Sequence, residues 1–408
     1  MNISAIIAEY NPMHLGHLYH IKKTRESTNC DGIICVMSGN FVQRGEPAII
    51  DKWLRAKEAI LNGVDLVLEL PTLYSTSSSE FFSFGAVSLL DSLKGVNTLS
   101  FGSEHGDVKK LYELATIFVT EPEKYKYFLH EKLGKGLTFP KARSEALIAF
   151  LKEEKREKNL EEIMEILQCS NNILAIEYCK SLIKLNSKIA PITFKRLGNN
   201  YNDKNITSNF PSATAIRKII HDDFSVKELE KFLPPSTYNL ILNLKENNYP
   251  FVIDSEMFKF IKYKAFQNPL QLKLIPDANE GIHNLINKAL ITSNDFEALL
   301  YEIKTKRYSR TRLARILCQF FIGFEAFDTN TLRKNKCPYG RVLGMNETGK
   351  KILKYIKSNS EFPIYTKLPR ESFMNDVLNL EIKATKAYSS LNTKVNPLDD
   401  FYKNPIIL

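Results

Sequence analysis

The chain has 408 residues, of which 44% are hydrophobic and 25% charged, and this composition excludes a disordered or fibrous protein. A chain of this length is expected to fold as two or three units that share an extended core. Its formal net charge of +10 suits a polyanionic partner such as RNA, although surface solubility explains it equally well.

The sequence lacks the marks of a membrane or exported protein. No apolar run reaches the roughly 18 residues that span a bilayer, and the N-terminus has no basic segment followed by an apolar, cleavable one. The six cysteines are spread widely, without a CxxC pair or a Cys/His cluster at metal-ligand spacing. We therefore expect a cytoplasmic protein with reduced, mostly buried thiols, and the sequence indicates no protein metal site.

Short apolar runs alternate with helical patterns from residue 1 to about 103. The runs NISAIIA, GIICVM, VDLVLEL and VNTLSFG are typical of buried strands. This alternation predicts an α/β fold with a Rossmann-like parallel sheet. Residues 105–185 have helical spacing without a clear strand, which predicts a helical insertion.

The segment PITFKRL, residues 191–197, returns to strand character. The polar loop GNNYNDKNITSNFP then leads into a helix that opens with Ser212. We place the first domain at residues 1–224 and a mainly helical, basic C-terminal domain at 225–408, with a shorter mixed segment from Tyr339 onward.

The segment AEYNPMHLGHLYHIKK joins the first strand to a helix that Gly16 opens. A helix N-terminus offers unpaired N–H groups, and the carboxyl ends of parallel strands are where α/β sheets bind ligands. A histidine N–H can donate to a phosphate oxygen whose charge grows as pyrophosphate leaves. This predicts a phosphate site at His14 and His17, against the alternative that their spacing on an ordinary helix start is a coincidence.

A second candidate segment is SATAIR, residues 212–217. Ser212 suits an N-cap, and its N–H group, Thr214 and Arg217 are placed to bind the β- and γ-phosphates from the opposite side. A plain helix cap is the alternative. The pairing is informative because nucleotidyltransferases with HxGH signatures, which the N-terminal segment resembles, combine that motif with a distal Ser/Thr-rich turn ending in arginine.

The chain resembles the bacterial tRNA(Met) cytidine acetate ligase family over essentially its full length. The motifs that carry this resemblance, in the family's order, are EYNPMHLGHLYH (9–20), MSGNFVQRGEPAIIDKWLRAKEAI (37–60), LSFGSE (99–104), NNILAIEY (171–178), KRLGNNY (195–201) and SATAIR. The resemblance implies that ATP and acetate form acetyl-adenylate and pyrophosphate. The acetyl group then passes to N4 of the wobble cytidine of elongator tRNA(Met), which gives N4-acetylcytidine.

The resemblance also implies which residues form the ATP site. They are Ile7, Ala8, Glu9, Tyr10, Asn11, Pro12, Met13, His14, Leu15, Gly16, His17, Leu18, Tyr19, His20, Gly102, Asn172, Lys195, Arg196, Ser212, Thr214 and Arg217. The candidate catalytic residues are His14, His17, Arg44 and Arg217. Acetate is ionised at pH 7 and can attack the α-phosphorus itself, so no protein nucleophile is needed. We expect Mg²⁺ to bridge phosphate oxygens with few protein ligands.

Acetyl-adenylate hydrolyses when water reaches it, so the site needs a cover. The loop SGNFVQRGEP is the predicted cover, with Arg44 and the nearby Asp51, Lys52 and Arg55 facing acetate or cytidine. A solvated helix face is an equally good interpretation of Asp51 and Arg55. In the pair at positions 171–172, capping explains one asparagine, and contact with adenine or ribose better explains the second.

The most basic stretch of the chain is the predicted RNA-binding surface. It comprises Lys304, Lys306, Arg307, Arg310, Arg312 and Arg315. On a helix, Arg312 and Arg315 share one face, which suits docking on a phosphate backbone. A solvated helix face is the alternative, and the run GKKILKYIK from 349 to 357 is open to the same two interpretations.

Two other functions fit the same motifs. A nucleotide adenylyltransferase of cofactor synthesis would use the HxGH and SATAIR elements with a phosphorylated co-substrate. A non-catalytic nucleotide- or RNA-binding protein would keep ATP binding without transfer. The sequence does not determine the oligomeric state.

Overall fold

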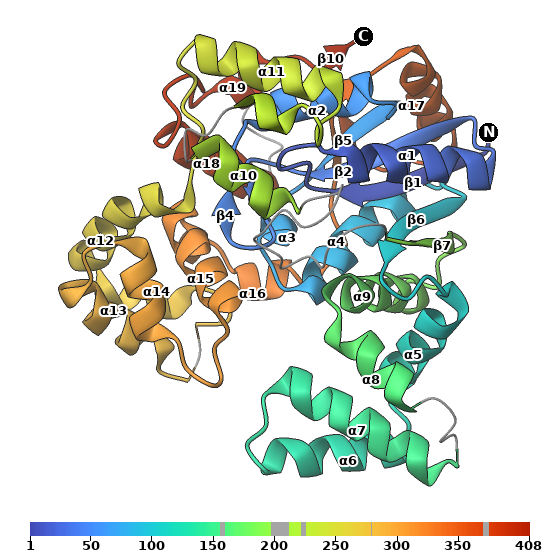
Figure 1. Ribbon diagram of the computed structural model, residues 1–408, viewed down its shortest axis with the longest axis vertical. Coiled ribbons are helices and arrows are strands. Elements are labelled where there is room, and N and C mark those ends of the chain that lie inside the picture. Colours follow the sequence, from blue (N-terminus) through green and yellow to red (C-terminus); the bar gives the residue numbers. More distant parts are fainter. Residues whose placement is uncertain (156–159, 197–211, 222–225, 279, 370–374) are drawn as a thin grey trace.

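The computed structural model describes residues 1–155, 160–196, 212–221, 226–278, 280–369 and 375–408. Its centre is a sheet with strand order β10-β8-β5-β2-β1-β6-β7, and β9 pairs with β8 (Figure 1). The strands are β1 (Ile3–Ala8), β2 (Gly32–Ser38), β5 (Leu66–Leu70), β6 (Thr98–Ser103), β7 (Ala190–Lys195), β8 (Gly340–Met345), β9 (Ile364–Tyr365) and β10 (Ile406–Ile407). Strands β1, β2, β5, β6 and β7 are parallel, whereas β8 pairs antiparallel with β5.

The four apolar runs predicted as strands form β1, β2, β5 and β6, so the predicted α/β fold is confirmed. Both β2 and β5 are buried along their whole length, as expected for strands covered on two faces. Successive side chains of β1 enter different cores. Ile3 and Ala5 pack into the larger core, and Ile6 packs into the smaller one.

Helices cover both faces of the sheet. The smaller core includes residues of α1 (Leu15–Thr28) and α2 (Lys52–Leu61). The larger core includes residues of α3 (Thr72–Ser75), α4 (Ser79–Ser92), α9 (Ser170–Lys184) and α17 (Glu347–Asn359). This two-sided cover leaves the carboxyl ends of the parallel strands as the place for a site.

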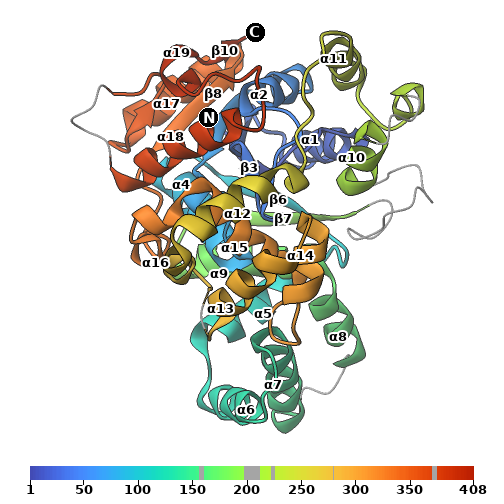
Figure 2. The same ribbon diagram turned by 90° about the vertical axis from the view of Figure 1, so that its left-hand side faces the viewer.

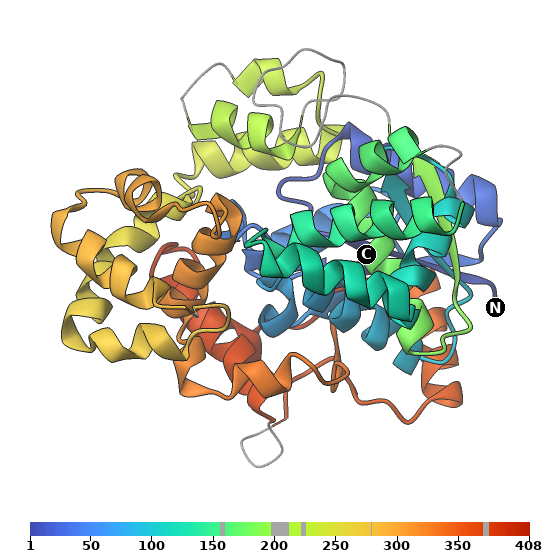
Figure 3. The same ribbon diagram turned by 90° about the horizontal axis from the view of Figure 1, so that it is seen from below.

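Between β6 and β7 the described chain is helical. The helices before α9 are α5 (Val108–Thr120), α6 (Glu123–Gly134), α7 (Phe139–Glu153) and α8 (Leu160–Gln168). Helices α6 and α7 project from the body of the molecule (Figures 1 and 2), and in the view from below they lie side by side (Figure 3).

After β7 come α10 (Ala213–His221), η1 (Val226–Leu229) and α11 (Pro235–Glu246). A helical lobe follows, at the left of Figure 1. It comprises η2 (Asp254–Glu256), α12 (Met257–Gln267), η3 (Pro269–Leu274), α13 (Ile282–Thr292), α14 (Phe296–Ile303), α15 (Arg310–Ile322), η4 (Phe324–Ala326) and α16 (Thr329–Leu332).

The chain then returns to the sheet. Strands β8, β9 and β10 complete it, with α17, α18 (Asp376–Ser389) and α19 (Asp399–Tyr402) between them in the chain. Strands β8 and β10 and the three helices lie together in Figure 2. The sheet thus takes in strands from both sides of residue 224. Division of the chain into two domains there stays a prediction.

A buried cluster of charged residues holds this C-terminal segment against the sheet. The Lys52 ammonium lies 2.6 Å from Glu69 Oε1, 2.8 Å from Asp400 Oδ1 and 3.3 Å from Glu381 Oε1. Arg341 Nη1 lies 2.7 Å from the same Asp400 oxygen. The cluster therefore joins α2 and β5 to β8, α18 and α19.

The described residues contain no helix long and apolar enough to cross a membrane. The six cysteines are free thiols, and all of them except the half-buried Cys30 and Cys169 are buried, as predicted.

Candidate active site

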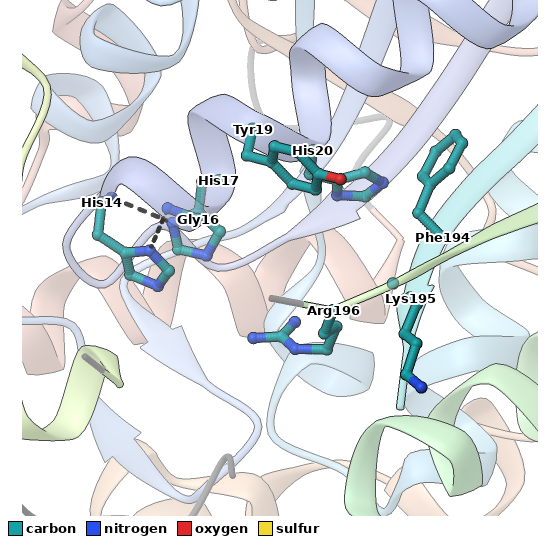
Figure 4. A pocket seen from close by; sticks show the side chains of 9 residues that line it. His14, Gly16, His17, Tyr19, His20, Phe194, Lys195 and Arg196 are labelled. Atoms are coloured by element: carbon teal, nitrogen blue, oxygen red, sulfur yellow. Dashed lines mark hydrogen bonds between the residues drawn. The ribbon is translucent and has the colours of Figure 1, made fainter. Parts of the chain in front are cut away.

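The HxGH segment lies where β1 ends and α1 begins (Figure 4). His14 is the N-cap of α1, and its Nδ1 accepts a hydrogen bond from Gly16 N at 3.1 Å. His17 Nδ1 accepts one from His14 N at 3.2 Å. A Cβ on residue 16 would lie 2.9 Å from the His14 ring, so this close approach requires glycine.

These two hydrogen bonds fix the tautomer of both rings. A backbone N–H donates to each Nδ1, so the proton of each neutral ring is on Nε2. Burial lowers the pKa of His14 to about 3, and burial together with His14 lowers the pKa of His17 well below its ordinary value. At pH 7 the stacked pair, with ring centroids 3.7 Å apart, therefore offers two neutral Nε2–H donors.

A chain of hydroxyl groups holds His20. Thr24 Oγ1 donates to the His20 carbonyl at 2.9 Å, so Thr24 must accept from Ser100 Oγ at 2.7 Å. Ser100 Oγ in turn lies 2.9 Å from His20 Nε2 and accepts its proton. Burial lowers the pKa of His20 to about 4, so this third imidazole is also neutral at pH 7.

The three histidines line a cavity of about 340 Å³. It lies at the carboxyl ends of β1 and β6, as expected for a parallel sheet. Its remaining walls come from α4, the start of α9, the start of α10 and a small hairpin of β3 (Phe41–Val42) and β4 (Glu46–Pro47). A smaller hollow beside it, drawn in Figure 4, shares the histidines and adds Phe194 and Lys195.

Arg217 joins the SATAIR turn to the HxGH segment. Its Nη1 donates to the Asn11 carbonyl at 2.9 Å, and its Nη2 lies 2.6 Å from Glu46 Oε1. The side chain of Asn11 accepts from Ile49 N at 2.8 Å, while its buried Nδ2 has no partner among the described residues. The two segments, about 200 residues apart in sequence, therefore meet at one cavity with an unused donor between them.

The β3–β4 hairpin, which is part of the predicted cover, runs along the cavity. Gln43 N donates to Glu9 Oε1 at 2.9 Å, and Arg44 Nη1 lies 3.4 Å from Thr214 Oγ1. Gly45 has a φ of 79°, and a Cβ there would lie 2.3 Å from Arg315 N. The hairpin is therefore packed tightly against α15. Its action as a cover and a contact of Arg44 with acetate or cytidine stay predictions.

Most predicted ATP-site residues come together. Those lining the cavity are Ile7, Ala8, Glu9, Tyr10, Asn11, His14, Gly16, His17, His20, Gly102, Arg196, Ser212, Thr214 and Arg217. Tyr19 and Lys195 line the smaller hollow. Among the described residues, those that line neither space are Pro12, Met13, Leu15, Leu18 and Asn172. Contact of each with ATP stays a prediction, and the loop at 198–211 and positions 197–201 of KRLGNNY lie outside the described residues.

The two asparagines at the start of α9 are held by Glu104, which the sequence did not single out. Its carboxylate accepts from Asn172 N at 2.8 Å and from Asn171 Nδ2 at 2.7 Å. Asn172 is buried, and its Oδ1 accepts from His105 N at 3.0 Å. Only Asn171 of this pair lines the cavity.

Asp51, Lys52 and Arg55 are buried and line neither the cavity nor the smaller hollow, so the interpretation of Asp51 and Arg55 as a solvated helix face is wrong. Asp51 caps α2 by accepting from Trp53 N at 3.0 Å. Lys52 is fully buried in the ion cluster. Arg55 is also buried, and it donates to the Glu9 carbonyl at 2.6 Å and the Ser38 carbonyl at 3.1 Å, at the ends of β1 and β2. These charges stabilise the fold, because Asp51 caps a helix and Lys52 and Arg55 have buried partners far away in sequence.

The basic stretch lies on the helical lobe, and its charges are not equivalent. Arg307 and Arg310 pair with Glu280 at 3.3 Å and Glu297 at 2.6 Å. The side chain of Arg312 donates to a backbone carbonyl and stacks over the Tyr308 ring, and Arg315 is half-buried. Lys304 and Lys306 are exposed. The run at 349–357 lies on α17, whose apolar face packs in the larger core.

Sequence reasoning missed two parts of the cavity. One is Glu46, which pairs with Arg217. The other is an apolar wall made by Phe82, Phe101, Ile173, Leu174 and Tyr178. The wall had no separate signal, because apolar residues at helical or strand spacing are read as core.

Comparison with known proteins places the chain in a family. A family model described as HIGH Nucleotidyl Transferase matches residues 1–400. Proteins named tRNA(Met) cytidine acetate ligase from Clostridium tetani and Clostridium novyi are 50% and 51% identical to it, over 100% of each chain. Crystal structures of Thermotoga maritima TmcAL, apo and bound with alpha-thio ATP, superpose with TM-scores of 0.93 and 0.90 at 32% identity, and cover 100% of both chains. As its motifs predicted, the chain therefore belongs to the HIGH nucleotidyl transferase family and, within it, to the tRNA(Met) cytidine acetate ligases.

Proposed function

We propose that this protein uses ATP to activate acetate as acetyl-adenylate and transfers the acetyl group to N4 of the wobble cytidine of elongator tRNA(Met). The observation that carries this proposal is the meeting of two fixed Nε2–H donors, on His14 and His17, with Arg217 at one cavity. The names of the Clostridium relatives and the alpha-thio ATP bound to the Thermotoga protein support the choice of substrates. We also propose that the enzyme works in the cytoplasm, because its proposed substrate is a tRNA.

In the first step an acetate oxygen attacks the α-phosphorus of ATP. A new O–P bond forms, the bond between the α-phosphorus and the bridging oxygen breaks, and pyrophosphate leaves with that electron pair. Neutral Nε2–H groups and Asn11 Nδ2, which has no partner in the described part of the chain, donate to phosphate oxygens, and Arg196 and Arg217 supply positive charge. The protein accelerates this step by position and electrostatics.

We propose that Mg²⁺ enters with ATP. The described residues contain no group of three or more His, Cys, Asp or Glu side chains that could hold a metal ion. Mg²⁺ commonly keeps several waters and binds through substrate phosphates, so its entry with ATP does not require such a group. When bound, the ion neutralises charge on the leaving pyrophosphate.

We propose that tRNA binds the helical lobe through its phosphates, with the exposed Lys304 and Lys306 as contacts. This stretch leads into α15, and α15 packs on β4, whose Glu46 lines the cavity. RNA on the lobe would therefore lie next to the site. Lysine contacts give affinity, so the choice of this tRNA must come from other contacts.

The test is exchange of labelled pyrophosphate into ATP, measured with and without acetate. We expect exchange in the wild type only with acetate, and none in His17→Ala or Arg217→Ala. The matched controls are His130→Ala, an exposed histidine on α6, and Lys218→Ala, the exposed neighbour of Arg217 on α10. Both controls should exchange at the wild-type rate.

Acetate dependence also separates the alternatives. A cofactor adenylyltransferase would exchange pyrophosphate with a phosphorylated co-substrate and ignore acetate. A non-catalytic binding protein would bind ATP without exchange. Mass analysis of the wobble cytidine of elongator tRNA(Met) after incubation with ATP and acetate then tests the second step, and unmodified cytidine would refute it.

A further inference from the structure

The carboxylate of Glu9 is fixed at the edge of the cavity. Glu9 follows the last residue of β1, is partly exposed and lines the cavity. Its Oε1 accepts from Gln43 N at 2.9 Å, and its backbone carbonyl accepts from Arg55 Nη1 at 2.6 Å. Both ends of the residue are therefore held, and the carboxylate keeps lone pairs for another partner.

Among the other titratable groups at the cavity, the second carboxylate and the two histidines of the HxGH motif already have partners. Among the described residues that line it, the carboxylates are Glu9 and Glu46, and Glu46 is in an ion pair with Arg217. His14 and His17 each use Nδ1 to accept a backbone N–H and carry a proton on Nε2. Neither ring can accept a further proton without losing the hydrogen bond that caps α1.

We propose that Glu9 is the general base of the transfer step, the group that takes the proton lost by the amine of cytidine as it is acetylated. This inference rests on the proposed function. It gives Glu9 a role different from the ATP contact that the family resemblance implies.

The N4 lone pair attacks the carbonyl carbon of acetyl-adenylate, so that a C–N bond forms and the carbonyl π electrons move to oxygen. Glu9 takes one N4 proton. When the carbonyl reforms, the C–O bond to the phosphate breaks and AMP leaves with its electron pair. The amine is conjugated with the ring and is a poor nucleophile, so removal of its proton during attack lowers the barrier.

The surroundings of Glu9 make it a better base than an ordinary carboxylate. Burial raises its pKa, and the nearby Glu46 raises it further, whereas the Gln43 N–H, Arg217 and Arg44 lower it, with a net upward shift. Arg55 faces the backbone side of the residue from α2. A raised pKa means that transfer should slow as pH falls through it, because the protonated carboxyl cannot accept a proton.

The test is Glu9→Gln, which keeps an oxygen for the Gln43 N–H and loses the base. Acetate-dependent pyrophosphate exchange reports adenylate formation. Single-turnover transfer from enzyme-bound acetyl-adenylate to tRNA reports the second step. We expect exchange within about threefold of the wild type and transfer slowed roughly 10²–10⁴-fold, the usual contribution of a general base. Glu9→Asp should restore part of the transfer rate, and Glu26→Gln, an exposed change on α1, should alter neither step.

The pH profile adds a readout that a structural role would not change. Wild-type transfer should lose rate toward acid pH, and Glu9→Gln transfer should be flat over the same range. Transfer by Glu9→Gln near the wild-type rate would overturn the inference. Equal loss of exchange and transfer would also overturn it, since Glu9 would then serve the nucleotide. Absence of acetate-dependent exchange in the wild type would instead refute the proposed function.

Discussion

Replacement of Lys52 by methionine tests the buried ion cluster. Methionine fills a similar volume, so the main change is the loss of one ammonium from three carboxylates at 2.6, 2.8 and 3.3 Å. Lys52, Glu69 and Glu381 are fully buried, and water cannot replace the lost charge. The carboxylates are left with one guanidinium, that of Arg341.

Removing one partner of a buried ion pair costs about 3–5 kcal/mol, because the remaining charge is buried without compensation. With an unfolding entropy of about 2.1 cal/mol/K per residue, a chain of 408 residues should lose roughly 4–6 °C in Tm. The loss should depend on pH. Lys52 lowers the pKa of Glu69 and of Asp400, so both values rise without it. The stability of the variant is therefore kept at low pH, where these two groups are protonated, and is lost as pH rises through the raised values.

The assay is thermal unfolding of the wild type and Lys52→Met at pH 5 and pH 8, followed by circular dichroism. The control is Lys23→Met, which removes an exposed ion pair with Glu26 at 2.8 Å and should leave Tm unchanged. A fall in Tm at pH 8 no larger than that of the control, or a larger fall at pH 5 than at pH 8, would refute this reasoning.

Three further changes test other parts of the structure. Burial lowers the pKa of His20 from its ordinary value of 6.5 to about 4, so the wild type loses stability as pH falls from 6.5 to 4. The difference in Tm between the wild type and His20→Gln should therefore shrink over this pH range. A difference that stays constant would contradict this. Replacing Lys304 and Lys306 by alanine should reduce the slope of log affinity for tRNA against log salt by about 1.5 and leave pyrophosphate exchange intact; an unchanged slope would place the RNA elsewhere. Gly45→Ala, where a Cβ meets the α15 backbone at 2.3 Å, should lower Tm and transfer more than Gly136→Ala, where φ is similar and no atom lies within 4 Å; equal effects would exclude the contact as the cause.

The sequence predicted the strands that consist of continuous apolar residues. Continuous apolar runs gave β1, β2, β5 and β6 because both faces of a parallel sheet are covered. Strand β8 was missed, since its sequence GRVLGM has two glycines and an arginine that read as exposed. Arg341 is buried there because Asp400, 59 residues later, pairs with it. No window of local sequence contains that partner.

The absence of distant partners from any local stretch of sequence also explains which parts of the site were predicted and which were missed. The HxGH spacing places one histidine at the N-cap and the next at the third helical position, so a local pattern predicted donors at the start of α1. The pairing of Arg217 with Glu46 spans 171 positions, and Lys52 meets Glu381 across 329. The local sequence therefore predicted that charged residues near the site contact ligands, whereas several of them form buried ion pairs or hydrogen bonds within the fold.

The charge states of the side chains at the cavity determine how each step of the reaction depends on pH. His14, His17 and His20 are neutral at pH 7 and stay so well into the acid range, because burial lowers the pKa of each. Among the described residues that line the cavity, the positive charge therefore comes from arginines, which do not titrate near neutral pH. Protonation of the site histidines cannot make acetyl-adenylate formation sensitive to pH in this range. If only acetyl transfer slows toward acid pH, the loss of rate requires another group with a raised pKa. Glu9, at the end of β1, has a raised pKa and lines the cavity.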